Sequence, residues 1–289
     1  MRSVGRSRVA PYLFLLPFYL AFAVFWLVPI AASLMYSFTS WTGMGSFEFR
    51  GLENYVTLVR DPTFWRALRN TFSYVLIYNA IMLPLATVIA LLLNAAVPRL
   101  GRAFRTVYFV PVTVSLVVVA LVFDLLLNRE FGPVNHLLAA IGIDSNPRWL
   151  TSSQYAPWTI IMMRVWRATG YYSAFVFAGL QGIPKDIIEA ARVDGASELR
   201  LTWHVILPQL RPILLFVFVM SSIWSFQLFD EPWILFQGGP GNSTLTILQY
   251  LYQNTFLFGK VGYGAAMSYV LTLIIVAFSL LQFRVLDRR

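Results

Sequence analysis

Cysteine is absent from this chain of 289 residues, and charged side chains are scarce. Without cysteine there is no disulfide framework, no thiolate nucleophile and no cysteine metal ligand. Only 12% of the residues are Asp, Glu, Lys or Arg, whereas an ordinary soluble domain carries about 25%. The two histidines, His136 and His204, have no second ligand at metal-binding spacing, so we expect no metal site.

Two further absences limit the function. The sequence contains no Gly-x-x-x-x-Gly-Lys-Ser/Thr loop, so it offers no nucleotide site of that kind. It also lacks the series of short alternating segments that is typical of an outer-membrane barrel. What remains is a chain that is 58% hydrophobic, with too little polar surface for a water-soluble globule. We therefore expect the bilayer to be its solvent.

Six long apolar runs predict an all-α integral membrane protein. Each run reaches the roughly 20 residues that a helix needs to cross the hydrocarbon core, and a spanning backbone satisfies its own hydrogen bonds as a helix. We expect one membrane domain over residues 1–289, with a polar loop at 181–206. The predicted spans are residues 11–37, 71–93, 106–127, 156–180, 207–229 and 264–286.

The basic residues are distributed unevenly between the two sides of this predicted bundle. With the N-terminus in the cytoplasm, 13 of the 22 Lys and Arg residues lie inside and 7 outside, while Arg164 and Arg167 fall within a span. The short inner loop with Arg99, Arg102 and Arg105 has no acid. This bias follows the positive-inside rule and predicts that both termini are cytoplasmic. The net charge of +9 would also suit nucleic acid, but the apolar bulk favours membrane lipid as the partner instead.

The loop at 181–206 predicts two short helices at the cytoplasmic membrane surface. Pro184 favours a first helical turn, and Glu189 falls near the positive end of that helix. Gly195 stands where a left-handed residue would end the helix. Ser197 is placed to cap a second helix, which ends before Pro208. A polar, helix-forming loop in an otherwise apolar chain predicts a cytoplasmic partner.

The residues of this loop resemble the signature loop of bacterial ABC-importer permeases. The matching string is Ile183-Pro184, Glu189-Ala190-Ala191, Asp194-Gly195-Ala196 and Leu207-Pro208. Gly51-Leu52-Glu53-Asn54-Tyr55, Gly238-Gly239-Pro240 and Gly262-Tyr263-Gly264-Ala265-Ala266 are similar to the maltose- and glycerol-3-phosphate-type sugar permeases. The large extra external domain of the maltose permease is absent. The resemblance implies a type I importer permease fold with six transmembrane helices and a cytoplasmic coupling helix between the fourth and the fifth.

The same resemblance implies a carbohydrate importer in the bacterial inner membrane that is driven by ATP and depends on a binding protein. The implied partners are a second homologous permease subunit, an ABC ATPase dimer and an extracytoplasmic sugar-binding protein. ATP and Mg²⁺ would bind in the ATPase and no cofactor in this chain, which would be a transport subunit without catalytic residues. The residues implied to couple to the ATPase are Glu189, Ala190, Ala191, Asp194, Gly195, Leu207 and Pro208.

Polar residues within the fourth and fifth predicted spans suggest where a substrate passes. Helical spacing puts Arg164, Arg167 and Tyr171 on one face of the fourth span, and charge inside a membrane usually faces a cavity or a partner. The candidate pathway residues are Arg164, Arg167, Tyr171, Ser221, Ser225 and Gln227. Counted from Glu189, the sugar-contacting positions of the maltose permease fall here at Arg164, Ala168, Tyr171, Ser221, Ser225 and Leu228. Since three of these positions differ in chemistry, the resemblance does not carry over a substrate.

Several alternatives stay open at this stage. A secondary carrier would need no ATPase, but it usually shows internal repeats with broken helices. An intramembrane enzyme would need ionisable groups at catalytic spacing, and Asp124, Arg164 and Arg167 do not supply them. Two arginines suit an anionic substrate such as a sugar phosphate, but they also donate to the hydroxyls of a neutral oligosaccharide. Arg167 has a structural alternative as well, in an ion pair with Asp124 or Asp230.

Overall fold

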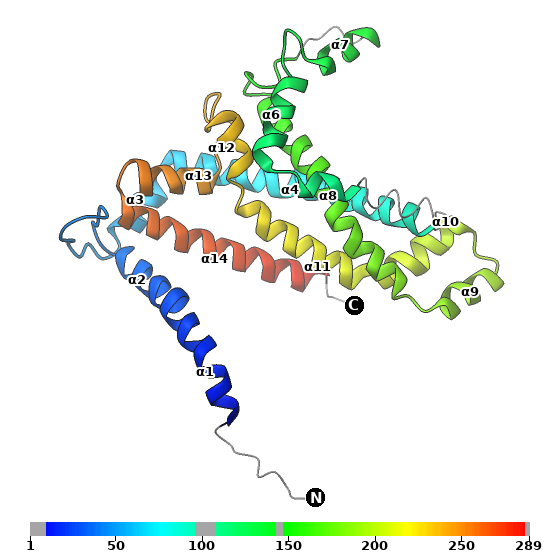
Figure 1. The fold of residues 1–289 in the computed structure, drawn as a ribbon, viewed down its shortest axis with the longest axis horizontal. Coiled ribbons are helices and arrows are strands. Elements are labelled where there is room, and N and C mark those ends of the chain that lie inside the picture. Colours follow the sequence, from blue (N-terminus) through cyan, green and yellow to red (C-terminus); the bar gives the residue numbers. More distant parts are fainter. Residues whose placement is uncertain (1–9, 96–107, 143–146, 287–289) are drawn as a thin grey trace, which may run out of the picture. The chain divides into compact units, whose positions relative to one another are not determined.

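The computed structural model describes residues 10–95, 108–142 and 147–286, and these ranges are helical with connecting loops (Figure 1). Within them there is no β-strand, only an isolated antiparallel bridge between Thr39 and Phe49. This confirms the all-α prediction. The inner-loop residues Arg99, Arg102 and Arg105 and both chain ends lie outside the described residues.

The chain divides into two compact units. One comprises Met1–Asp61 and Leu251–Thr272, and the other comprises Pro62–Tyr250 and Leu273–Arg289. A single membrane domain over residues 1–289 therefore stays a prediction. The helices of the first unit are α1 (Ala10–Phe22), the π-helix η1 (Ala23–Leu27), α2 (Val28–Tyr36), α3 (Glu53–Arg60), η3 (Gln253–Leu257) and the first part of α14 (Val261–Leu286).

In the first unit, the predicted span 11–37 forms one helical rod with a π-helical segment in its middle. Pro29 follows η1, has no N–H group, and its ring would clash with the carbonyl of Phe25 in a regular α-helix. The wider π turn accommodates that ring. After the rod, the Asn54 amide donates to the carbonyl oxygens of Ser37 and Thr39 at 2.8 Å each. In this way the Gly51–Tyr55 motif holds the chain where it leaves the first helix.

The second unit contains the remaining helices, among which α4 and α8 lie side by side and α11 packs against both (Figure 1). Tyr78, Met82, Ile160, Val176 and Leu210 belong to the buried core between them. The helices are α4 (Pro62–Ala95), α6 (Leu116–Leu126), α7 (Pro133–Ala140), α8 (Ala156–Gln181), α9 (Lys185–Val193), α10 (Glu198–Leu201), the π-helix η2 (Thr202–Ile206), α11 (Leu207–Phe226), α12 (Asp230–Phe236), most of α13 (Ile247–Tyr252) and the last part of α14.

Four described helical segments are long and apolar enough to cross a bilayer: Tyr12–Tyr36, Pro62–Asn94, Glu198–Phe226 and Val261–Val285. The 26-residue α8 is long enough as well, at about 39 Å for 1.5 Å per residue, but Arg164 and Arg167 make it more polar. The shorter Leu116–Leu126 is apolar. These helices confirm a protein that crosses the membrane several times, while the count of six spans stays a prediction.

Three boundaries differ from the sequence-based expectation. α4 begins at Pro62 rather than near residue 71, because Pro is favourable in a first turn and Phe64, Ala67 and Leu68 give the added segment a buried face. The described part of the predicted span 106–127 is helical at 108–113 and again from Leu116, with a break between. Ser115 there has an extended backbone, φ −55° and ψ 136°, as the residue before α6. Between the fifth and sixth predicted spans, the chain forms α12 and α13.

Gly170 on α8 allows the backbone at Tyr108 to approach this helix closely. A Cβ atom at this position would lie 1.8 Å from the carbonyl oxygen of Tyr108. Small residues that let backbones approach are a common means of packing helices in membranes. Gly170 is therefore required by packing and not by its own backbone conformation.

We expect Gly170→Ala to destabilise the protein, although Gly→Ala in a helix normally stabilises it by about 1 kcal/mol. The clash with the Tyr108 backbone should cost about 1–3 kcal/mol. Thermal unfolding in detergent, followed by fluorescence-detected size exclusion, measures the difference. Gly182→Ala is the matched control, since its nearest atom would be 3.3 Å away. An unfolding temperature that rises equally in both variants would contradict the close approach.

Candidate functional site

The predicted coupling loop forms a well-defined helix, α9, with a regular termination. Gly195 has φ +78°, its N–H donates to the carbonyl of Arg192 at 3.0 Å, and the N–H of Ala196 donates to the carbonyl of Ala191 at 3.0 Å. These two bonds make a Schellman motif, which needs a left-handed residue at the position of Gly195. The predicted helix end at Gly195 is confirmed in position and in cause.

The second helix is capped as predicted, but its predicted end before Pro208 is wrong. α10, η2 and α11 follow one another without a break, so Glu198–Phe226 is one helical segment. The Ser197 hydroxyl accepts a hydrogen bond from the N–H of Arg200 at 3.4 Å, at the start of α10. The Arg192 side chain pairs with Glu198 across the turn, at 3.1 Å. This ion pair links α9 to α10.

One face of α9 is packed and the other is open. Ile188 and Ala191 pack against the buried core of the second unit. Glu189, Ala190 and Asp194 are exposed, and the Glu189 side chain makes no hydrogen bond or ion pair with the residues that the structure describes. Val193 is 88% exposed, an unusual position for an aliphatic side chain on a polar loop. An acidic surface with apolar and small residues beside it is suited to contact another protein.

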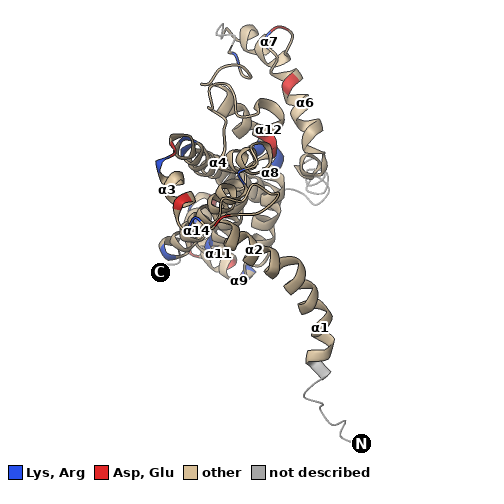
Figure 2. Cartoon of the chain, turned by 90° about the vertical axis from the view of Figure 1, so that its left-hand side faces the viewer, with Lys and Arg blue, Asp and Glu red and all other residues tan. Residues whose placement is uncertain are grey.

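The fourth-span residues come together around a cavity of about 380 Å³ at the other end of the unit. α4 contributes Tyr78, and α8 contributes the face with Arg164, Arg167 and Tyr171. α12 contributes the two acids at its start, Asp230 and Glu231. The lining residues are Tyr78, Val112, Leu116, Arg164, Arg167, Ala168, Tyr171, Tyr172, Trp224, Gln227, Leu228, Phe229, Asp230 and Glu231. Charged residues are few along the described helices, and basic and acidic residues meet near α8 and α12 (Figure 2).

Arg164 on α8 has contacts from three other helices in this cavity wall. Its guanidinium lies 3.7 Å from the Glu231 carboxylate on α12, and the two side chains are only 12% and 10% exposed. The same guanidinium donates to the Ser225 hydroxyl on α11 at 3.2 Å and lies 4.9 Å from the centre of the Tyr78 ring on α4. An ion pair, a hydrogen bond and a cation–π contact together offset the cost of removing this charge from water.

The other candidates divide into those that line the cavity and those that do not. Arg167, Tyr171 and Gln227 line it, and the buried Nε atom of Arg167 has no hydrogen-bond partner among the described residues. Ser225 stands behind the wall and also donates to the Ser221 carbonyl at 2.7 Å. Ser221 is fully buried and its hydroxyl donates to the Asn79 amide oxygen on α4. The structure thus brings five candidates together and places Ser221 between helices.

Sequence reasoning missed three residues of this site. Glu231 lies outside the predicted spans and was not among the candidates, whereas it pairs with Arg164 inside the wall. Asn79 and Tyr78 were not considered. A polar amide within an apolar run is a signal for Asn79, because polar groups in a membrane need partners. No sequence signal links Glu231 to Arg164, since no regular spacing relates them.

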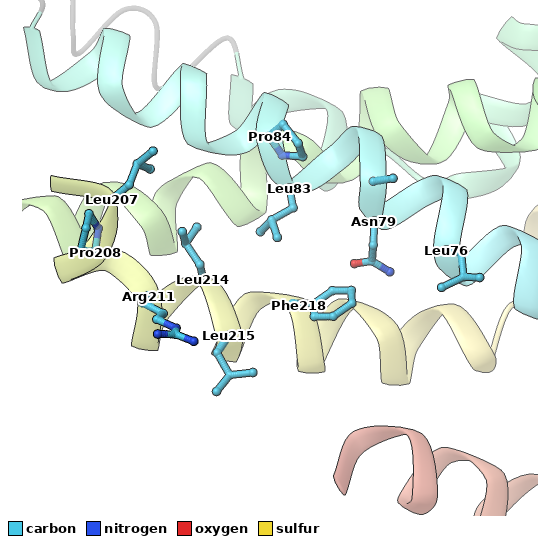
Figure 3. Close-up of a pocket in the computed structure, with 11 residues that line it drawn as sticks. Leu76, Asn79, Leu83, Pro84, Leu207, Pro208, Arg211, Leu214, Leu215 and Phe218 are labelled. Atoms are coloured by element: carbon cyan, nitrogen blue, oxygen red, sulfur yellow. The ribbon is translucent and has the colours of Figure 1, made fainter. Parts of the chain in front are cut away.

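A separate apolar groove lies between α4 and α11 (Figure 3). Its volume is about 610 Å³, and Asn79 and Arg211 are its polar members. Leu207 and Pro208, which were assigned to the coupling loop, line one end of this groove. These two residues start α11 rather than belong to the exposed surface of α9.

Comparison with known proteins agrees with this arrangement. Residues 83–289 match the family described as "Binding-protein-dependent transport system inner membrane component". The chain is 39% identical to the lactose transport system permease protein LacF of Rhizobium radiobacter, with 98% of each chain covered. It is 35% identical to the probable ABC transporter permease protein YurN of Bacillus subtilis (strain 168), with 97% of each covered.

A solved structure shows the same fold. A chain of a bacterial ABC transporter that imports the acidic polysaccharide alginate superposes with a TM-score of 0.84 at 22% identity, with coverage of 96% of this chain and 95% of that one. The predicted ABC-importer permease fold is confirmed. The chain belongs to the family of binding-protein-dependent transport system inner membrane components, the permease subunits of ABC transporters, and is a multi-pass protein of the inner membrane.

Proposed function

We propose that this chain is the transmembrane permease subunit of an ATP-driven, binding-protein-dependent importer of carbohydrate. Relatives that cover nearly its whole length are named for the transport of lactose and of arabinooligosaccharides, which supports a sugar as the cargo. The complete importer contains a second homologous permease, an ABC ATPase dimer and an extracytoplasmic sugar-binding protein. ATP and Mg²⁺ bind in the ATPase, while this chain binds no cofactor and catalyses no reaction. Both of its termini lie in the cytoplasm.

The observation that carries the proposal is the open acidic face of α9. The coupling segment consists of Glu189, Ala190, Ala191, Asp194 and Gly195, in which Ala191 packs against the core. Leu207 and Pro208 begin α11 and carry the movement of this segment into the membrane helices. Glu189 is exposed and has no partner within the described part of the chain, while the opposite face of the helix is anchored by Ile188 and the Schellman turn. A rigid helix with a free charged face is suited to transmit force from a partner without bending.

The cavity on the opposite side supports a route for the sugar. Arg164, Arg167 and Gln227 offer donors to hydroxyl oxygens, and Tyr171 and Trp224 offer aromatic faces for a sugar ring. Ser225 positions Arg164, and Ser221 stabilises the helix pair behind it. ATP binding closes the ATPase dimer, α9 moves with it, and the helices rock so that the cavity opens to the outside. Hydrolysis resets the inward-open state.

Glu189→Arg should separate the permease from its ATPase. Charge reversal on the exposed face of α9 opposes docking electrostatically, so uptake in proteoliposomes should fall by at least tenfold, as for an interface residue near the centre of a contact. The amount of ATPase that co-purifies in mild detergent should fall with it. Glu130→Gln, an exposed acid on the outer loop, is the control. Full ATPase recovery with unchanged uptake would refute the coupling role.

Arg164→Gln should impair uptake without impairing assembly. The change removes the ion pair with Glu231 and a donor at the cavity wall, so uptake should fall by about tenfold or more. Co-purification with the ATPase should stay at the wild-type level because α9 is unaltered. Arg129→Gln, at an exposed outer position, provides the control. If Arg164→Gln carried every tested sugar at the wild-type rate, the cavity would not be the transport route.

A further inference from the structure

The charges that line the cavity are balanced. Two cations, Arg164 and Arg167, face two anions, Asp230 and Glu231. The sequence alone left an anionic and a neutral substrate open, because two arginines on one helical face suit a carboxylate or a phosphate. The acids that start α12 change that expectation, since they lie in the same wall.

Glu231 sets the charge around Arg164. Among the described residues it is the only acid within ion-pair distance of that guanidinium, at 3.7 Å. The guanidinium also contacts the Ser225 hydroxyl and the Tyr78 ring, which are both uncharged. Glu231 itself is 8% exposed, so solvent screens the pair little. Without its carboxylate, Arg164 would be an enclosed cation without a counter-charge.

A ligand in the cavity would therefore meet donors and acceptors in similar measure. Arg167 donates, Asp230 accepts, and the Gln227 amide does both. A sugar hydroxyl is likewise both donor and acceptor. A carboxylate or phosphate would instead have to approach Asp230 and Glu231, and the guanidinium of Arg164 is already engaged on three sides. Like-charge juxtaposition in a partly desolvated site is unfavourable.

We propose that Glu231 is a specificity-determining residue: by neutralising Arg164 it makes this cavity select neutral carbohydrates over oxyanionic ones. The proposal rests on the proposed function, in which a carbohydrate passes through this cavity. In this proposal, the short helix α12, which lies outside the predicted spans, controls which sugars the membrane helices accept. Discrimination of this kind arises from a built-in repulsive group as much as from an attractive one.

The first experiment identifies the cargo. The complete importer with its binding protein is reconstituted in proteoliposomes that contain ATP, and uptake of labelled lactose, arabinobiose, digalacturonate and glucose 6-phosphate is measured. The proposal expects uptake of a neutral sugar and not of the two oxyanionic probes. Uptake of an oxyanionic probe in preference to the neutral ones would overturn it. If no carbohydrate is carried, the proposed function itself fails and this inference with it.

The second experiment tests Glu231 directly, at the permease and away from the binding protein. The purified permease–ATPase complex is loaded with the labelled transported sugar, which is then displaced by D-galactose or by D-galacturonate, two probes that differ only at C6. In wild type, galactose should displace at a concentration about tenfold lower than galacturonate. Glu231→Gln should shift the ratio by about tenfold toward galacturonate, because Arg164 loses its counter-charge.

Two further variants keep this test decisive if Glu231→Gln is less stable. The double variant Arg164→Gln with Glu231→Gln removes both charges and should return the displacement ratio toward galactose. Glu130→Gln, a carboxylate outside the cavity, should leave the ratio at the wild-type value. A purely structural role of Glu231 would lower the binding of both probes alike. An unchanged ratio in Glu231→Gln would overturn the proposal.

Discussion

The second unit is organised around one buried charge, the guanidinium of Arg164 on α8. A cation away from water is costly unless it is paired and hydrogen-bonded. Its contacts come from α4, α11 and α12 through Tyr78, Ser225 and Glu231. Because each contact is directional, the packing of these three helices around α8 has to satisfy them together. A buried ion pair adds little net stability in general, so its value here lies in specifying one arrangement of the helices.

Close backbone packing supplies the rest of that specification. In a bilayer the hydrophobic effect does not drive helices together, and interfaces depend on small residues and polar contacts. Gly170 admits the Tyr108 carbonyl, and the side chain of Ile213 occupies the space beside Gly179. The Ser221 hydroxyl bonds to Asn79 between α11 and α4. These contacts lie on the helices that also surround Arg164, so they fix the relative positions of the helices that line the cavity.

Local features of the chain were predictable, and contacts between distant segments were not. The apolar runs located the main helices, and the end of α9 at Gly195 followed from helix termination alone. Helical spacing correctly put Arg164, Arg167 and Tyr171 on one face. It could not show what that face meets, so the pairing with Glu231 was missed. For the same reason Ser221 was expected at the cavity, although it is buried beside Asn79.

The irregular elements were missed for a related reason. α12 and α13 are too short for periodicity to reveal them, and the break before α6 occurs within a run whose apolar composition is uniform. The cavity depends on the break before α6 and on α12. Val112 and Leu116 flank that break and line the cavity, and the two acids that line it begin α12. Where function needs a cavity inside a membrane, the backbone departs from regular helix only at places enclosed by protein. Composition cannot distinguish those places from lipid-facing ones.

The connectivity of the chain joins the proposed coupling helix to the proposed sugar cavity. α9 is linked by residues 182–184 to α8 and, through α10 and η2, to α11. These are the helices that carry Arg164 and Ser225, whose side chains meet at 3.2 Å. Arg164 lies 17 residues before the end of α8, about 26 Å along a helix. Because hydrogen-bonded helices resist stretching, a force applied to α9 reaches both sides of that contact. The proposed coupling therefore needs no long chain of side-chain contacts, only two rigid helices that end at the same loop.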